Sequence, residues 1–143
     1  MDKSQKTKCR TIILSHAASC AAKCSSFKEV NVINREMTMT IFSMCRSLAP
    51  VFGVNITEQD AKSMTDDVMN QVKFSDGLGI CPCIQIALPF RSLFSRLLSP
   101  FLRNPVEAKI EEAGRILVAK LEQMAEDHSR DNHLTEKADP NCL

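Results

Sequence analysis

Apolar side chains recur every three or four residues in five separate stretches of this 143-residue chain. That spacing places them along one side of an α-helix, whereas a half-buried strand needs strict alternation. No stretch of the chain carries a convincing strand pattern. The sequence therefore predicts an all-α fold, a small bundle of four or five helices with an irregular Gly-, Pro- and Cys-containing segment in the middle. The stripes are Ile12, Ile13, His16, Ala17, Cys20 and Cys24; Met37, Ile41, Met44 and Leu48; Ala61, Met64, Val68 and Val72; Phe90, Leu93, Phe94, Leu97, Leu98, Phe101 and Leu102; and Val106, Ile110, Ala113, Leu117, Leu121 and Met124.

Two local signals mark helix starts. Thr57 and Asp60 have the spacing of a capping box, in which each side chain accepts a hydrogen bond from the other residue's backbone N–H. Asn104 followed by Pro105 is a second signal, because asparagine caps a helix and proline suits the first helical position. Helices are therefore expected to begin at residues 58 and 105.

The remaining boundaries follow from helix breakers and composition. Pro50 removes a backbone donor and predicts an end or a kink in the preceding helix, and Gly53 suits the turn that follows. Residues 1–6 and 128–143 are polar, which predicts a polar tail at each end and a disordered one at the C-terminus. One helical domain, residues 7–127, is expected between them, with helices near 7–25, 33–49, 58–73, 90–102 and 105–126.

The chain contains seven cysteines, without the regular spacing of a small secreted scaffold. This favours a reducing compartment in which most thiols pack as small apolar groups. His16, Cys20 and Cys24 nevertheless share one helix face, and imidazole and thiolate are zinc ligands. One proline separates Cys81 from Cys83, and such a pair binds metals or exchanges disulfides. These five residues are the candidate metal or redox ligands. The alternative for the first three is a packing face of small residues with His16 hydrogen-bonded at its edge, and the main expectation is a chain with no cofactor.

The amphipathic stretch within residues 84–102 is the strongest candidate for function. It includes several arginines, and no acidic residue lies between Asp76 and Glu107. An interfacial helix has this composition, since Phe and Leu enter the acyl boundary of a membrane while Arg meets lipid phosphate. A core helix of a small bundle carries the same stripe, so both interpretations stay open. The residues expected to contact a membrane or a partner are Phe90, Arg91, Leu93, Phe94, Arg96, Leu97 and Phe101.

Charge and motifs argue against several functional classes. A formal net charge of +1 lacks the basic surplus of a general nucleic-acid binder. The sequence has no glycine-rich phosphate loop with its lysine, no HExxH and no nucleophile elbow, so we expect a protein that is not an enzyme. The uncharged stretch 77–90 is shorter than the about 20 apolar residues that span a bilayer. The expected location is the cytoplasm, with at most peripheral contact with the inner membrane.

Residues 12–64, which begin IILSHAASCAAKC and include SLAPVFGVNIT, resemble an uncharacterised bacterial helical domain. That domain occurs C-terminal to Era-like GTPase domains and in YcjF-type inner-membrane proteins. The motif His16-Ala17-Ala18 is similar to its first helix, Met39 to Thr57 to its second element, and Ala61-Lys62 to its third. Asn104 to Gly114 is weakly similar to its final helix. The resemblance covers about half the chain, and the segment 77–102 replaces the apolar hairpin of the family.

This resemblance implies a helical accessory module that works beside a membrane or a GTPase, and it transfers no catalytic residue. The overall prediction is a non-enzymatic interaction module that docks through residues 84–102. Its expected partners are a membrane surface, a GTPase or other protein, or a second copy of the chain, and not nucleic acid. Two alternatives remain, a metal or redox protein that uses Cys20, Cys24, Cys81 and Cys83, and a structural helical bundle with no ligand.

Overall fold

The computed structural model of the chain describes residues 1–74 and 104–138, and every described element is helical. Within these residues there are four α-helices, one short 3-10 helix and no strand, so the prediction of an all-α fold is confirmed. The expected helix at 90–102 lies outside the described residues. The elements are α1 (Lys3–Cys24), α2 (Val30–Leu48), η1 (Ala49–Phe52), α3 (Glu58–Val72) and α6 (Pro105–Ala138).

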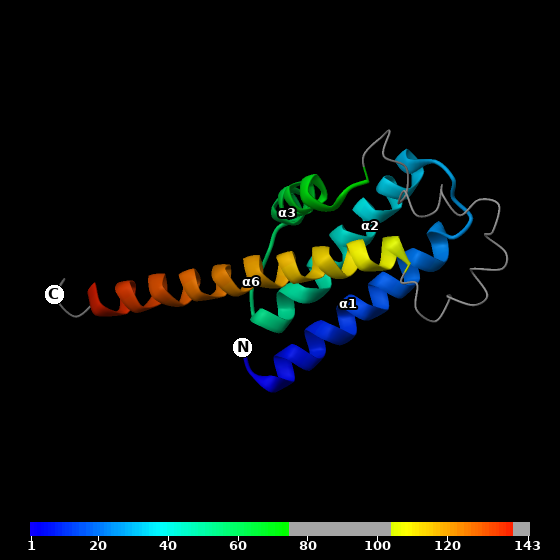
Figure 1. Cartoon of the computed structure of the whole chain (residues 1–143). Helices are drawn as coiled ribbons and strands as arrows, with labels where there is room; N and C mark the ends of the chain where they lie inside the picture. The colour runs from blue at the N-terminus through cyan, green and yellow to red at the C-terminus, as the bar shows by residue number, and fades with distance from the viewer. Residues whose placement is uncertain (75–103, 139–143) are drawn as a thin grey trace.

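The helices α1 and α2 run in opposite directions, α6 runs in roughly the same direction as α2, and α3 is seen nearly end-on (Figure 1). A short connection joins α1 to α2, which is the usual arrangement of antiparallel neighbours in a bundle. The helices α2 and α6 each pack against both α1 and α3. As a result, α1 and α3 lie on opposite sides of the α2–α6 pair (Figure 1). The end of α3 and the start of α6 lie at the same end of the bundle.

The core is built from the stripes that the sequence predicts. Met37, Ile41, Met44 and Leu48 of α2 are completely buried, as their helical spacing requires. The predicted inward residues of α3 and α6 are also buried, except that Met124 is half-buried. These buried residues are Ala61, Met64, Val68 and Val72 of α3 and Val106, Ile110, Ala113, Leu117 and Leu121 of α6.

The predicted helix signals are present. The Thr57 side chain accepts from the Asp60 backbone N–H at 3.1 Å, and the Asp60 carboxylate accepts from the Thr57 backbone N–H at 3.2 Å. Asn104 Oδ1 accepts from the Val106 N–H at 3.0 Å and caps α6. The helix α2 stops before Pro50, and the following 3-10 turn closes on Gly53, whose φ of 66° lies in the left-handed region that favours glycine.

The polar tail predicted for residues 1–6 is wrong, because α1 begins at Lys3. Asp2 and Gln5 form a capping box in which Asp2 Oδ1 accepts from the Gln5 N–H at 2.7 Å and Gln5 Oε1 accepts from the Asp2 N–H at 3.1 Å. These reciprocal bonds satisfy two backbone donors that a helix start otherwise leaves open. Residues 3–6 are therefore the first turn of the helix.

The disordered tail predicted for residues 128–143 is also wrong as far as residue 138, because α6 continues to Ala138. No glycine or proline interrupts the chain between Arg115 and that end. Glu126 and Arg130 stand four residues apart, an arrangement that supports an exposed helix. Residues 126–134 of α6 are exposed, and this end of the helix extends past the other helices (Figure 1).

Candidate functional site

The structure places His16, Cys20 and Cys24 on one face of α1, with contacts that favour packing over metal binding. The Sγ atoms of Cys20 and Cys24 are 4.0 Å apart, and both side chains are buried. His16 Nδ1 lies 2.8 Å from the Ile12 carbonyl oxygen, which can only accept, so Nδ1 carries the proton. Nε2 then accepts from the Ser43 hydroxyl at 3.4 Å. Both ring nitrogens of His16 are therefore engaged within the bundle.

Burial raises the pKa of three thiols of the described helices, Cys9, Cys24 and Cys45. Burial, with a smaller contribution from the adjacent Cys20, raises the pKa of Cys24 to about 12. Burial also raises the pKa of Cys45, and burial together with the Glu122 carboxylate raises the pKa of Cys9. The thiolate is the form that binds metals and attacks disulfides. In residues 1–74 and 104–138 no group of three His, Cys, Asp or Glu side chains is placed to hold a metal ion.

Several predicted site residues lie outside the described residues. They are the second cysteine pair, Cys81 and Cys83, and the whole docking set of Phe90, Arg91, Leu93, Phe94, Arg96, Leu97 and Phe101. Their roles stay predictions from the sequence.

A groove of about 520 Å³ lies between α1 and α6, and the sequence did not predict it. Its walls combine apolar and charged side chains from the two helices. Apolar groups with a few polar ones at the rim are typical of ligand sites, and this volume falls within their usual range. The lining residues are Met1, Lys6, Cys9, Arg10, Ile13 and Leu14 from the α1 side and Glu111, Arg115 and Val118 from α6.

The close approach of the two helices beside this groove depends on Gly114. A Cβ atom at this position would lie 2.7 Å from Ile13 Cγ1 and 2.8 Å from Ile13 Cγ2, so only glycine fits without movement. Glycine in a helix interior costs about 1 kcal/mol relative to alanine. This cost is offset by the contact of Ile13 with the backbone of α6.

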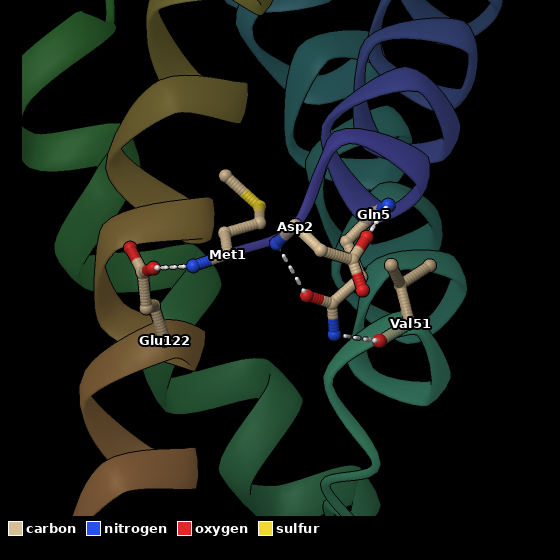
Figure 2. A network of polar contacts seen from close by, with 5 residues as sticks. All are labelled: Met1, Asp2, Gln5, Val51 and Glu122. Atoms are coloured by element: carbon tan, nitrogen blue, oxygen red, sulfur yellow. Dashed lines mark hydrogen bonds and ion pairs between the residues drawn. The ribbon is translucent and has the colours of Figure 1, made fainter.

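Polar contacts fix the start of α1, as Figure 2 shows, and Met1 is one of the residues that line the groove. The Met1 amino nitrogen lies 3.4 Å from Glu122 Oε1 on α6. Gln5 Nε2 donates to the Val51 carbonyl of η1 at 3.2 Å, in addition to the role of Gln5 in the capping box. The first turn of α1 is thus tied to two other elements, and the position of Lys6 at the groove follows from this attachment.

Charge is distributed unevenly between α1 and α3. The helix α1 contains no acidic residue, whereas α3 has an acidic excess. Because these helices lie on opposite sides of the α2–α6 pair, the bundle has a basic side and an acidic side (Figure 1). The charged residues are Lys3, Lys6, Lys8, Arg10 and Lys23 on α1, and Glu58, Asp60, Lys62, Asp66 and Asp67 on α3.

A second cleft, also of about 520 Å³, lies where α6 leaves the bundle and passes the turn after η1. His128 and His133 line it, so the helical continuation of α6 brings two residues of the predicted tail beside the folded body. Its lining also includes Phe52, Val54, Asn55, Met124 and Asn132. Among its described lining residues the cleft offers two imidazoles and two amide groups, without a third metal-binding side chain.

None of the described helices has a stretch apolar enough, over sufficient length, to cross a bilayer. The chain matches no family model, and neither a curated protein nor a solved structure matches it. The resemblance to the GTPase-associated helical domain therefore stays a prediction that rests on the residues quoted for it.

Proposed function

We propose that the protein is a non-enzymatic helical module that docks to a membrane surface through residues 84–102. The observation that carries this proposal is the sequence of that segment. A seven-residue stripe of Phe and Leu is combined with Arg91 and Arg96, in a stretch that has no acidic residue from 77 to 106. Interfacial helices combine an apolar stripe with basic residues in this way.

The flanks of the docking segment support the proposal, because both are attached to the same end of the bundle (Figure 1). After α3, the Phe74 backbone is bound twice by Asn34 of α2. Asn34 Nδ2 donates to the Phe74 carbonyl at 2.9 Å, and the Phe74 N–H donates to Asn34 Oδ1 at 3.1 Å. On the other side, Asn104 caps α6. The bundle thus supplies two fixed attachment points for the segment between them.

Apolar burial is expected to dominate the docking energy. Each Phe or Leu side chain that leaves water contributes about 1.5–3 kcal/mol. A basic residue near an anionic membrane contributes about 1 kcal/mol. Several apolar residues would therefore supply most of the affinity, while Arg91 and Arg96 orient the helix. A GTPase-type partner is the second prediction, and it rests on the family resemblance alone.

Liposome co-sedimentation tests the proposal. The full chain is compared with Phe94→Asp and Arg96→Glu, and with the control Leu134→Asp, which changes an exposed apolar residue on the extended part of α6. We expect the wild type and the control to pellet with vesicles, Arg96→Glu to pellet less, and Phe94→Asp to stay in the supernatant. Far-UV circular dichroism checks that each variant is folded. Equal pelleting of wild type and Phe94→Asp, or no pelleting of wild type, would contradict the proposal.

A further inference from the structure

Three cations line the groove between α1 and α6 without an ion-pair partner among the residues that the structure describes. They are Lys6 and Arg10 on one wall and Arg115 on the other, and they outnumber the one carboxylate of the lining, the buried Glu111. The ion pairs of the described helices involve other residues: the Met1 amino group with Glu122, Lys23 with Glu36, and Lys120 with Asp67. Two arginines that face one groove from different helices are suited to an anion, since guanidinium groups bind phosphate and carboxylate oxygens through paired hydrogen bonds.

The same groove has an apolar wall that a simple anion would not use. Ile13, Leu14 and Val118 line it together with the cations, and Leu14 is 40% exposed, which is unusual for a leucine in this bundle. A ligand that matches both features carries a negative head group and an adjoining apolar part.

The charge distribution of the whole bundle points to the source of such a ligand. The groove lies along α1, the helix with five cations and no acidic residue, and the acidic helix α3 lies on the far side. Near an anionic bilayer, this arrangement attracts the groove side and repels the α3 side. A bilayer surface therefore fits the groove better than a dissolved anion does.

We propose that the groove between α1 and α6 binds the head group of an anionic phospholipid in a membrane. The phosphate lies between Arg10 and Arg115 with Lys6 beside it, and the glycerol and first acyl carbons lie against Ile13, Leu14 and Val118. This inference rests on the proposed docking to membranes and adds the class of lipid and a second contact site. The segment 84–102 supplies apolar attachment, and the groove supplies the preference for negative lipid.

Vesicle binding with a double variant tests this inference. The full chain, Arg10→Gln/Arg115→Gln and the control Arg46→Gln/Lys62→Gln are titrated with vesicles of phosphatidylcholine alone and of phosphatidylcholine mixed with phosphatidylglycerol. All four substituted residues are exposed, so each variant loses two surface charges and keeps the core. We expect the wild type and the control to bind the mixed vesicles more tightly, and the groove variant to lose about ten-fold of that affinity. An unchanged preference in the groove variant would overturn the inference.

Further experiments distinguish a phospholipid from other occupants of the groove. They also distinguish failure of this inference from failure of the proposed function. Inorganic phosphate and a short-chain phosphatidylglycerol are each used to displace the wild type from mixed vesicles. If both displace it at the same concentration, the groove binds free phosphate, and the assignment to a phospholipid is overturned. Sedimentation velocity without lipid tests for self-association. If the wild type self-associates and the groove variant does not, the groove binds the acidic helix of a second copy, and the assignment to a phospholipid is overturned. If Phe94→Asp abolishes binding while the groove variant binds like wild type, the docking function stands and the groove inference fails. No binding of wild type to either vesicle contradicts both.

Discussion

Ile13 of α1 lies directly over Gly114 of α6, where its side chain fills the space that a Cβ atom on residue 114 would need. The two residues lie far apart in the sequence, and their contact sets how closely α1 and α6 approach. Because α1 and α6 form the two walls of the candidate lipid groove, this pair also determines the shape of the site.

Replacing Gly114 with alanine should destabilise the protein by about 1 kcal/mol. The added methyl group would lie within 3 Å of three atoms of Ile13, and overpacking of this kind costs about 1–3 kcal/mol. The higher helix propensity of alanine offsets about 1 kcal/mol of this cost. The branched Ile13 side chain has little freedom to withdraw. Urea unfolding followed by circular dichroism measures the change.

A double-mutant cycle separates this contact from a general effect on α6. In an Ile13→Ala background, Gly114→Ala should become neutral or stabilising, since the clashing atoms are gone and only the propensity gain remains. If Gly114→Ala costs the same with and without Ile13, the close approach does not limit the packing of the two helices.

Alkaline conditions should weaken the fold through Cys24. Its pKa is raised to about 12 by burial, from a usual thiol value of 9.0, so the folded chain keeps a proton that the unfolded chain loses. The stability that this thiol contributes is present in full below pH 9 and is lost as the pH rises toward 12. The expected slope from this thiol is about 1.4 kcal/mol per pH unit inside that window.

Free energies of unfolding at pH 7, 9, 10 and 11 test the effect of Cys24. Cys24→Ala should be less stable at pH 7, because it leaves a small cavity, and should lose less stability above pH 9. The control Ala17→Gly destabilises the protein by about 2 kcal/mol, through lost helix propensity and a lost buried methyl group, and keeps the thiol, so its alkaline slope should equal that of wild type. Identical slopes for Cys24→Ala and wild type would contradict the assignment.

Removing the capping box of α1 should fray its first turn. Asp2→Ala loses the bond to the Gln5 N–H, and N-cap substitutions of this type cost about 0.5–2 kcal/mol. Amide hydrogen exchange should then speed up in the first turns of α1 and stay unchanged in α3. The control Ser4→Ala changes an exposed residue of the same turn and should leave exchange as in wild type. Slow exchange in both variants would mean that the contacts of this turn with Glu122 and Val51 hold it without the capping box.

The parts of the fold that the sequence predicts well are those with a local cause. The buried stripe of α2 follows from helical spacing, and the start of α3 follows from the Thr57–Asp60 capping box, which involves residues three apart. The start of α1 was missed because Lys3 to Lys8 lack an apolar stripe, although Asp2 and Gln5 carry the capping signal. The distal part of α6 was missed because a helix that is already nucleated can continue through a polar sequence.

The groove was beyond sequence analysis for a different reason. It depends on which helices become neighbours, and neither Arg10 nor Arg115 carries a local signal that the two share a site. The separation of cationic α1 from acidic α3 likewise appears only once α2 and α6 are placed between them. The formal net charge of +1 does not indicate this separation, because positive and negative charges nearly cancel over the whole chain.

Asn34 should prove essential for anchoring the end of α3 and, with it, one flank of the docking segment. Its side-chain amide bonds both the N–H and the carbonyl of Phe74. Asn34→Ala removes two part-buried hydrogen bonds, each worth about 0.5–1.5 kcal/mol, and should lower the free energy of unfolding by about 1–3 kcal/mol. Asn31→Ala, one turn earlier on α2 and exposed, is the matched control and should change stability little. If the attachment also serves docking, Asn34→Ala should weaken vesicle binding at a temperature where the bundle is still folded. Vesicle binding equal to that of the Asn31→Ala control would show that docking does not depend on a fixed flank.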